Sequence, residues 1–430
     1  MARRRKEEQE VEPSGNAMDM SALLKGTTKA QTVDHTNMMH GRDKVLTPVP
    51  EMNVFLAGGL PLGVMVEAFG DPSSGKSSWA YQTLGMFQNQ YENGIGIIVD
   101  TEASVDAIRM THMGCDPSKV LRIPSDTIEV GFSEVFKILD NKLNNPALKD
   151  IPMFILWDTI SLASTEKQFA NKDSLNGGGM MELPRILKRQ LTNMIPYLEK
   201  MPILVVLLNQ VTTEFHQYGA RLSSAGGWGL KHNMHLRLQF KSGKTDQDGI
   251  WATNKSSSVD MVKSKLSPLM KDMAISIDIT KGGVIDPDKS LLNYIANTGL
   301  PYIKNSGGWW DCRDLAVLYP EFDGRFDKFV LSDGSRYRIG EFNNYIKENR
   351  ILMNLFQIAL IDEMSRIYTY QGELVQPFRK KLWDELVEKV GINDLSGSTS
   401  DEESTTDQET LVPEGVDPDT GEFSPNEETV

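Results

Sequence analysis

The sequence predicts an α/β fold with a mostly parallel central sheet, followed by a smaller α+β domain and a disordered acidic tail. Between residues 46 and 283, short apolar runs alternate with helical patterns, as in proteins whose parallel strands are connected by helices. Residues 284–392 have a different sequence pattern, in which aromatic and glycine-rich turns separate predicted helices. Residues 393–430 consist mainly of Ser, Thr, Asp, Glu, Pro and Gly, so they cannot bury enough apolar surface to fold.

Six apolar runs in the first segment predict buried strands. They are Val64–Phe69, Ile95–Val99, Met153–Trp157, Ile203–Leu208, His235–Phe240 and Ala274–Ile279. A polar stretch rich in Gly, Ser and Lys separates the last two runs, which predicts a hairpin between them at one edge of the sheet. Helical patterns at residues 289–297, 338–349 and 352–369 fall in the C-terminal domain. Residues 1–45 are polar and are interpreted as an extended or partly helical arm.

Composition excludes several classes of protein. The chain has 430 residues, of which 40% are hydrophobic and 24% charged, as in ordinary globular proteins. Two cysteines, Cys115 and Cys312, cannot build a disulfide framework. No run of about 18 apolar residues predicts a membrane span. The basic first residues are followed by acids rather than by an apolar stretch, so no secretory signal is expected and a cytoplasmic location fits.

The formal net charge of −14 is unevenly distributed along the chain. Twelve Asp and Glu residues, and no Lys or Arg, lie between Asp394 and Val430, so the remainder of the chain is close to neutral. A near-neutral body can carry a basic groove, so the net charge does not exclude a nucleic-acid partner. Two hypotheses explain the acidic tail equally well. It could compete with DNA for the basic groove, or it could simply make the protein more soluble.

The most specific motif is Gly70-Asp71-Pro72-Ser73-Ser74-Gly75-Lys76-Ser77, which fits the phosphate-loop pattern GxxxxGK[ST] at every fixed position. A predicted strand precedes it and a helical pattern beginning at Ser78 follows it. The glycines allow backbone N–H groups to converge on phosphate oxygens, and the start of the helix favours negative charge. Lys76 is expected to reach the β and γ phosphates of ATP, and the Ser77 hydroxyl to bind Mg²⁺. A chance Gly/Ser turn is the alternative.

Polar side chains follow three of the predicted strands where a nucleotide would lie. Asp158 ends an apolar run and is the expected second Mg²⁺ ligand, although it would also suit a helix cap. Asp100 and Glu102 follow another run, and either acid could orient the attacking water; Glu102 lies further past the strand and is the preferred base, with a surface loop as the alternative. Gln210 follows Ile203–Leu208, where its amide could contact a γ-phosphate or simply form a turn.

Two segments have the residue types of a DNA-binding surface. Residues 171–184 contain three glycines and apolar side chains, including Met180, that could wedge between bases. Arg185, Lys188 and Arg189 follow at a spacing that places them near one helix face. This pattern is equally typical of a stripe that binds DNA phosphates and of an amphipathic helix whose polar face is simply solvated. Residues 211–231 are predicted to form a long loop suited to unstacked bases. Its candidate DNA contacts are Phe215, Tyr218, Arg221, Gly226 and Gly227.

Six segments in this order resemble the bacterial RecA recombinases and their phage-encoded relatives. They are Gly59–Gly63 with Val66–Gly70, Val99–Ala103, Leu208–Gln210, Gly226–Lys231, Val262–Leu266 and Gly307–Trp310. The likeness runs from about Gly58 to Lys281 and is weaker to about Asn349. A phosphate loop alone is common to many families, so the ordered set carries the specificity.

The resemblance implies a RecA-like ATPase that forms a helical filament of identical subunits on single-stranded DNA, with Mg·ATP between subunits. ATP binding would favour the DNA-binding form, and hydrolysis would release it. The implied activity is homologous pairing and strand exchange with double-stranded DNA in recombination and repair. The arm at residues 1–45 would serve oligomerisation, and single-strand-binding and loader proteins are further candidate partners.

The resemblance also implies roles for particular residues. Glu102 would be the catalytic base and Gln210 the γ-phosphate sensor. Lys263 and Lys265, which point to one side if they lie on a strand, would reach the ATP of the neighbouring subunit; an exposed basic edge strand is the alternative. Asp106 matches an adenine-contacting position. Arg109 replaces a Tyr that stacks on adenine, and its guanidinium could still stack.

The sequence departs from the RecA pattern at two positions near the second DNA segment. Trp228 replaces an Asn, and His232 replaces an aromatic residue involved in coupling ATP to DNA. Divergence of this kind indicates a phage-encoded member. Two other functions stay open, a hexameric helicase motor on a similar core and a nucleotide-gated DNA-binding scaffold without strand exchange. A helicase should use a trans arginine, whereas the trans candidates here are lysines.

Overall fold

The computed structural model describes residues 42–170, 182–216, 219–248, 251–266, 274–298, 304–306, 309–311, 315, 318–322 and 336–390. Most of the predicted N-terminal arm and all of the predicted acidic tail lie outside these residues, as do Met180 and Tyr218. None of the helices in the described ranges is long and apolar enough to cross a membrane.

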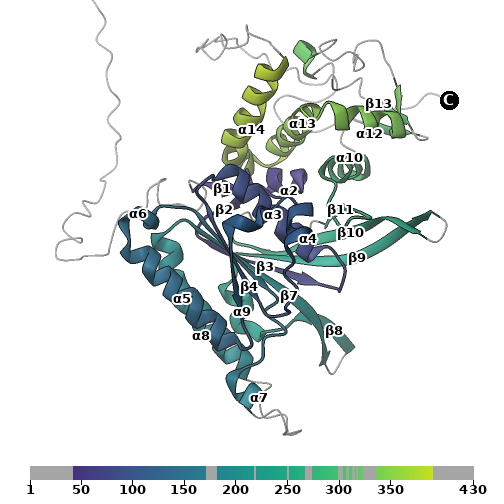
Figure 1. The fold of residues 1–430 in the computed structure, drawn as a ribbon. Helices are drawn as coiled ribbons and strands as arrows, with labels where there is room; N and C mark the ends of the chain where they lie inside the picture. Colours follow the sequence, from purple (N-terminus) through teal and green to yellow (C-terminus); the bar gives the residue numbers. More distant parts are fainter. Residues whose placement is uncertain are drawn as a thin grey trace, which may run out of the picture. The chain divides into compact units, whose positions relative to one another are not determined.

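The described part of the chain is organised around a nine-stranded sheet (Figure 1). Eight strands follow the order β11-β10-β9-β3-β7-β6-β4-β5, and β8 pairs with the far end of β7. The strands from β9 to β5 are parallel to their neighbours, whereas β10 and β11 are antiparallel. This confirms the predicted α/β fold with a mostly parallel sheet. The bounds are β3 (Val64–Gly70), β4 (Ile95–Asp100), β5 (Val120–Pro124), β6 (Met153–Asp158), β7 (Ile203–His216), β8 (Gly219–Ser224), β9 (Leu236–Asp248), β10 (Trp251–Ser264) and β11 (Ala274–Thr280).

The predicted edge hairpin is wrong in its pairing. β9 pairs with β10, and β11 pairs with β10 rather than with β9. β10 was missed because much of it is polar: among residues 253–264, whose burial the structure describes, only alternate side chains, those of Ser257, Val259 and Met261, are buried. β5 was missed for a similar reason, since Ile123 is its only buried residue. A strand that buries few side chains lacks the apolar run by which the other strands were predicted.

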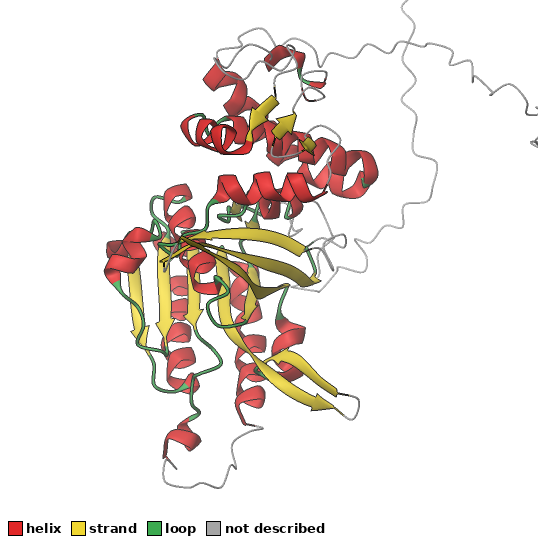
Figure 2. Cartoon of the chain, turned by 90° about the vertical axis from the view of Figure 1, so that its right-hand side faces the viewer, coloured by secondary structure: helices red, strands yellow, loops and turns green. Residues whose placement is uncertain are grey.

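The residues from 211 to 231 do not form the single loop that was predicted. β7 continues to His216 and forms an antiparallel hairpin with β8, which extends beyond the sheet (Figure 2). The helix α9 (Gly227–Asn233) follows directly. Backbone pairing between the two strands satisfies their N–H and C=O groups, so a long polar segment is accommodated without an irregular loop.

Helices cover both faces of the sheet and form a core with it. α5 (Ile128–Asn144) and α8 (Glu182–Lys200) run side by side on one face, and α3 (Lys76–Gln90) lies against the other (Figure 1). α8 buries Leu187, Leu191, Met194 and Leu198, which recur at the spacing of a single helix face. They pack with Trp157 of β6 and its neighbours in one cluster. This packing fixes α8 on that face of the sheet, and with it the basic residues that α8 carries.

The register of the parallel strands brings the predicted site residues to one edge. Gly70 at the end of β3 lies opposite Gln210 of β7, and Asp100 at the end of β4 lies opposite Asp158 of β6. Since β6 lies between β7 and β4, the ends of β3, β4 and β6 and the Gln210 position of β7 face a common crevice. Crevices of this kind, outside the carboxyl ends of parallel strands, are the usual ligand sites of open α/β sheets.

The C-terminal part combines helices with a small antiparallel sheet. β12 (Lys304–Ser306), β13 (Trp309–Asp311) and β14 (Arg336–Arg338) form the sheet. α10 (Pro287–Thr298), α12 (Ile339–Glu348) and α13 (Leu352–Ile367) match the predicted helical patterns, and α14 (Thr369–Val390) was not predicted. α10 and α13 both pack against α2 (Pro50–Phe55), where the Phe55 and Tyr294 rings meet edge to face at 5.6 Å.

Candidate functional site

The phosphate loop connects β3 to α3 and requires glycine at both of its glycine positions. Gly70 and Gly75 have φ angles of 150° and 96°. A Cβ on Gly70 would lie 1.8 Å from the carbonyl oxygen of Phe240, and one on Gly75 would lie 2.6 Å from Ile279 Cδ1. The Lys76 ammonium donates to the carbonyl oxygens of Gly70 at 3.0 Å and Asp71 at 2.6 Å. These contacts hold the lysine along the inside of the loop, where a phosphate would lie.

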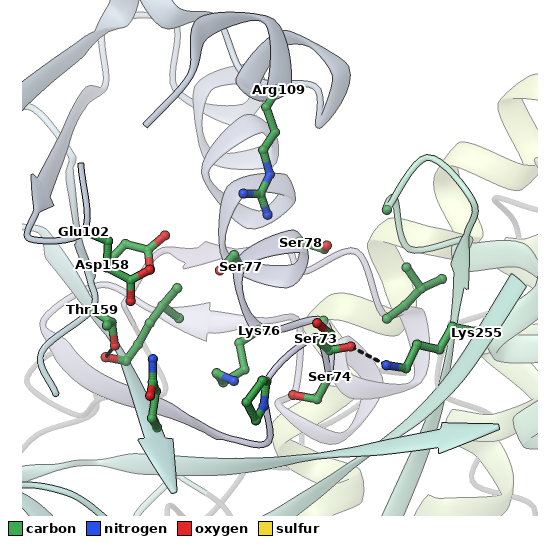
Figure 3. Close-up of a pocket in the computed structure, with 16 residues that line it drawn as sticks. Ser73, Ser74, Lys76, Ser77, Ser78, Glu102, Arg109, Asp158, Thr159 and Lys255 are labelled. Atoms are coloured by element: carbon green, nitrogen blue, oxygen red, sulfur yellow. Dashed lines mark hydrogen bonds between the residues drawn. The ribbon is translucent and has the colours of Figure 1, made fainter. Parts of the chain in front are cut away.

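The loop opens into a cleft of about 500 Å³, which is within the range of small-molecule sites (Figure 3). Most of the predicted nucleotide residues line it, and five residues that the sequence did not single out join them. The predicted lining residues are Pro72, Ser73, Ser74, Gly75, Lys76, Ser77, Ser78, Glu102, Arg109, Asp158 and Gln210. The additional lining residues are Thr159, Leu208, Lys255, Ile279 and Gly283.

Two carboxyl groups lie next to each other on one side of the cleft (Figure 3). Burial, together with the nearby charge of Glu102, raises the pKa of Asp158 to about 6; a hydrogen bond from Tyr81 opposes this rise. The pKa of Glu102 is also raised, first by burial and then by Asp100, while Lys76 opposes the shift. Burial lowers the pKa of Lys76. The pKa values of Asp158, Glu102 and Lys76 are thus all shifted toward the neutral form, as is common at sites that bind charged ligands.

Asp100 has a different role from Glu102. Its buried carboxylate accepts from the Arg122 guanidinium at 2.7 and 2.8 Å and from the backbone N–H of Ser104 at 3.2 Å. These bonds tie the segment that carries Glu102 to β4 and β5. The sequence allowed either acid as the base and preferred Glu102. In the structure Asp100 is engaged in structural bonds, whereas Glu102 lines the cleft.

Asp106 and Arg109 begin the next helix. Asp106 Oδ1 accepts from the Arg109 backbone N–H at 2.7 Å and caps α4 (Ala107–His112). Arg109 lines the cleft, with its guanidinium 5.9 Å from the centre of the Tyr81 ring. The Arg109 side chain therefore lies at the cleft, whereas the carboxylate of Asp106 has a structural partner in its own helix.

Two of the residues that the sequence did not reveal are explained by tertiary pairing. Thr159 Oγ1 donates to the carbonyl of Leu208 at 2.6 Å, and Thr101 Oγ1 donates to the carbonyl of Thr159 at 2.7 Å, so the ends of β4, β6 and β7 are locked together. Lys255 of β10 donates to the carbonyl of Ser73 at 2.8 Å. Thr159 follows Asp158 directly and could have been suspected. Lys255 lies in a Ser-rich stretch with no local signal.

The residues in the cleft fit Mg²⁺ bound together with a nucleotide. Mg²⁺ is usually held by one or two carboxylates, phosphate oxygens and water rather than by a cage of protein ligands. The Ser77 hydroxyl and the Asp158 carboxylate supply oxygen donors of the required kind. In the described ranges, no group of three His, Cys, Asp or Glu residues forms an all-protein metal site.

The predicted DNA residues that the structure describes lie on α8, α9 and the β7–β8 hairpin. Arg185 and Lys188 are exposed on α8. Gly226 and Gly227 adopt φ angles of 98° and 69° at the start of α9, which packs closely on α8. A Cβ on Gly229 would lie 2.5 Å from Lys188 Cβ, so the basic face of α8 adjoins α9. Phe215 and Arg221 belong to β7 and β8, opposite Ala220 and Glu214.

Lys263 and Lys265 lie at the end of β10, away from the residues that line the cleft of their own subunit. The Lys263 ammonium donates to the carbonyl oxygens of Lys231 at 2.6 Å and His232 at 3.0 Å, near the end of α9. Burial and the charge of Lys265 lower the pKa of Lys263 to about 8. Lys263 thus adjoins α9, and the backbone N–H of Lys265, just past the end of β10, donates to the carbonyl of His235 at 2.8 Å.

A family model described as the RecA N-terminal domain matches residues 48–284, more than half of the chain. The chain belongs to the RecA family. The matched residues contain the phosphate loop, both carboxylates, Gln210 and the β7–β8 hairpin. All residues that line the cleft therefore lie within the part of the chain that matches the RecA model. The predicted recognition of a RecA-family recombinase is confirmed.

Curated RecA proteins are similar over a large part of their length. "Protein RecA" of Malacoplasma penetrans is 25% identical over 315 residues, covering 73% of this chain and 85% of that protein. "Protein RecA" of Frankia casuarinae is 26% identical over 323 residues, covering 74% and 83%. "Protein RecA" of Symbiobacterium thermophilum is 25% identical over 261 residues, covering 60% and 71%. Membership of the RecA family implies a DNA-dependent ATPase related to recombination and repair.

Proposed function

We propose that this RecA-family protein is a DNA-dependent ATPase and recombinase that forms ATP-bound filaments on single-stranded DNA and catalyses homologous pairing and strand exchange. The observation that carries this proposal is the cleft itself. It brings together Lys76 at the start of α3, Glu102 just after β4, Asp158 at the end of β6 and Gln210 within β7 of a RecA core. The nearby basic face of α8 and the hairpin provide a surface for DNA.

In the proposed reaction, backbone N–H groups of Gly70–Ser78 and the Lys76 ammonium hold the β and γ phosphates of ATP. Ser77 and Asp158 would hold Mg²⁺, which neutralises developing charge on the phosphates. Glu102 lies beside Asp158 and would accept the proton of the attacking water, a role typically worth about 10²- to 10⁴-fold in rate. Gln210 would contact the γ-phosphate, and Arg109 would cover the adenine, near Asp106.

Lys263 and Lys265 would complete the site of the adjacent subunit. Each subunit then offers its cleft on one side and its lysine pair on the other. A head-to-tail contact between unlike surfaces builds a helical filament when the rotation does not close. ATP bound between subunits would favour the DNA-binding form, and hydrolysis would weaken it. The arm at residues 1–45 is proposed to add to the same interface.

Phosphate contacts from Arg185 and Lys188, and aromatic contacts from the hairpin, would bind single-stranded DNA without strong sequence preference. Phe215, Tyr218 and Arg221, with Met180 in the preceding segment, are the proposed base contacts, and Gly226 and Gly227 the proposed phosphate contacts. The protein would act in the cytoplasm. Its identity of about a quarter to cellular RecA proteins supports a phage-encoded member.

The proposal is tested by measuring ATP hydrolysis with and without single-stranded DNA, and by electron microscopy of the same mixtures. We expect DNA-stimulated hydrolysis and helical filaments. Rings would instead support a helicase motor. A strand-invasion assay with homologous and heterologous duplexes tests the strand-exchange activity. We expect product with the homologous duplex alone. If neither duplex gives product, the remaining function is that of a nucleotide-gated DNA-binding scaffold.

A further inference from the structure

A charged side chain lies in the middle of a fully buried strand of the sheet. All seven residues of β3 are buried, and Glu67 is completely inaccessible to solvent. The other residues of the strand are apolar or glycine, as expected between two parallel neighbours. An ionised carboxylate in such a place is costly unless it is paired and hydrogen-bonded. Glu67 therefore needs partners that compensate its charge inside the sheet.

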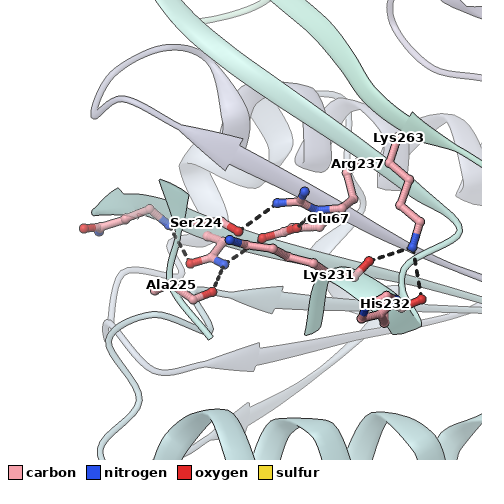
Figure 4. Close-up of polar contacts among 9 residues, drawn as sticks. Glu67, Ser224, Ala225, Lys231, His232, Arg237 and Lys263 are labelled. Carbon is pink, nitrogen blue, oxygen red and sulfur yellow. Dashed lines mark hydrogen bonds and ion pairs between the residues drawn. The ribbon is translucent and has the colours of Figure 1, made fainter. Parts of the chain in front are cut away.

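Glu67 receives one donor from each neighbouring strand (Figure 4). Arg237 of β9 donates from Nε to Glu67 Oε2 at 2.5 Å. Asn209 of β7 donates from Nδ2 to Glu67 Oε1 at 2.8 Å. The Arg237 side chain is 12% exposed and also covers the Phe69 ring at 4.7 Å. The carboxylate is thus fully engaged, and it fixes the side chains of both donors.

Each donor makes a second bond to the residues that leave the β7–β8 hairpin. Arg237 Nη2 donates to Ser224 Oγ at 2.8 Å, and Asn209 Nδ2 donates to the carbonyl of Ala225 at 2.8 Å. Ser224 is the last residue of β8, and Gly227 begins α9. The buried carboxylate therefore determines where the hairpin returns to the sheet.

The same group of residues reaches the nucleotide cleft. The backbone N–H of Gln210 donates to Asn209 Oδ1 at 2.9 Å, and Gln210 lines the cleft. The backbone N–H of Ala225 donates to the carbonyl of Gln210 at 3.3 Å. A shift of Gln210 in response to a phosphate would disturb Asn209 directly, and through Glu67 it would disturb Arg237 and Ser224.

Stability alone does not explain this arrangement, because replacing a buried ion pair by apolar residues is often neutral or stabilising. We propose that Glu67 and Arg237 are positioning residues that transmit the nucleotide state at Gln210 to the exit of the β7–β8 hairpin, and so set how strongly nucleotide and single-stranded DNA binding depend on each other. This inference rests on the proposed function, which supplies the two ligands.

The test uses Glu67→Gln in the full-length protein, a change that keeps the shape and removes the charge. The affinity for a fluorescent thymidine oligonucleotide is measured with a non-hydrolysable ATP analogue and with ADP. The ratio of the two affinities is the coupling, commonly about 5- to 150-fold in allosteric proteins. We expect the ratio to fall at least about fivefold in the variant, while affinity for the ATP analogue without DNA stays within about twofold of wild type.

Ser224→Ala is the second variant, because it leaves the buried pair intact and removes only the link from Arg237 to the hairpin. It decides the matter if Glu67→Gln fails to fold, and it should lower the same ratio. Asp362→Asn is the matched control: it breaks the ion pair with Arg379, held at 2.5 and 2.8 Å in the C-terminal region, and should leave the ratio unchanged.

A wild-type ratio in both folded variants overturns the inference, and so does an equal fall in the Asp362→Asn control, which would indicate a general loss of stability. A ratio of one in the wild-type protein is a separate result. It contradicts the proposed nucleotide-gated DNA binding itself, and the inference then falls with it. The wild-type measurement therefore distinguishes the two failures.

Discussion

Lys255 and Ser73 are joined by a hydrogen bond of 2.8 Å from the lysine ammonium to the serine carbonyl, although 182 positions separate them in the chain. The bond connects β10 to the phosphate loop, and Lys255 lines the cleft on the side opposite Glu102 and Asp158 (Figure 3). The antiparallel edge of the sheet thereby supplies a second cation close to the proposed phosphate site.

Replacing Lys255 by Met should weaken ATP binding by about tenfold, because hydrogen bonds of charged groups contribute about 1.5–3 kcal/mol and this lysine is partly exposed. Fluorescent-nucleotide titration measures the effect. Lys244→Met removes an exposed lysine from the same pair of strands and should leave the affinity unchanged. Equal affinities of both variants and the wild type would show that Lys255 does not support the loop.

Lys76→Ala should abolish ATP hydrolysis, since it removes the cation that the phosphate loop directs at the β and γ phosphates. Glu102→Gln should bind ATP normally and hydrolyse it about 10²- to 10⁴-fold more slowly, as for loss of a general base. Steady-state phosphate release and nucleotide titration separate the two effects. Turnover near the wild-type rate in Lys76→Ala would disprove the site, and lost binding in Glu102→Gln would argue against a base.

A mixture of two inactive variants tests the role of the lysine pair in trans. Lys76→Ala and the double variant Lys263→Ala, Lys265→Ala should each hydrolyse ATP poorly. Mixed together on single-stranded DNA, they should recover part of the activity, because some interfaces then combine an intact Lys76 with intact partner lysines. Activity no greater than that of the two separate proteins would mean that the lysines act elsewhere.

Trp228→Ala should weaken binding of single-stranded DNA. The Trp228 side chain is 75% exposed near the start of α9, and the Lys231 ammonium lies 5.6 Å from its ring centre. Stacking of a base on an aromatic ring is worth about 1–3 kcal/mol, so the affinity should fall by roughly 5- to 150-fold. Leu121→Ala, at another exposed apolar side chain, serves as the control. A fluorescence-anisotropy titration that finds both variants unchanged would contradict this role.

Glu51 should make stability depend on pH. It is fully buried on α2, and in the described part of the chain no other residue donates a hydrogen bond to its carboxylate oxygens. Burial, with a smaller contribution from Asp278, raises its pKa from 4.5 to about 8. Between these values the unfolded chain releases a proton that the folded chain keeps, so this group lowers the free energy of unfolding as pH rises from 4.5 to 8.

In the Glu51→Gln variant, the side chain at this position does not titrate in either the folded or the unfolded state. The free energy of unfolding of the variant, relative to wild type, should therefore increase by about 3 kcal/mol between pH 5 and pH 8. Urea denaturation at pH 5, 6.5 and 8 gives the comparison, and other titrating groups cancel in the difference. A difference between the two proteins that stays constant across these pH values would show that Glu51 is ionised in the folded protein.

The sequence by itself determined the parts of this protein that depend on local order. The phosphate loop is contiguous, and its glycines, Lys76 and Ser77 are specified by their spacing alone. The buried parallel strands are contiguous apolar runs, so their existence and the polar residues that follow those runs, Glu102, Asp158 and Gln210, could be predicted. Parallel strands present their carboxyl ends at one edge, and for that reason the cleft could be expected before its geometry was known.

Only the tertiary structure decided which distant segments meet. β10 is polar and buries only alternate side chains, so nothing local revealed that it lies between β9 and β11 or that Lys255 reaches Ser73. Glu67 in an apolar strand gave no sign of its partners, because Arg237 is 170 positions away. Hydrogen bonds and ion pairs between strands depend on sheet order and register, and these are set by packing of the whole chain rather than by any one segment.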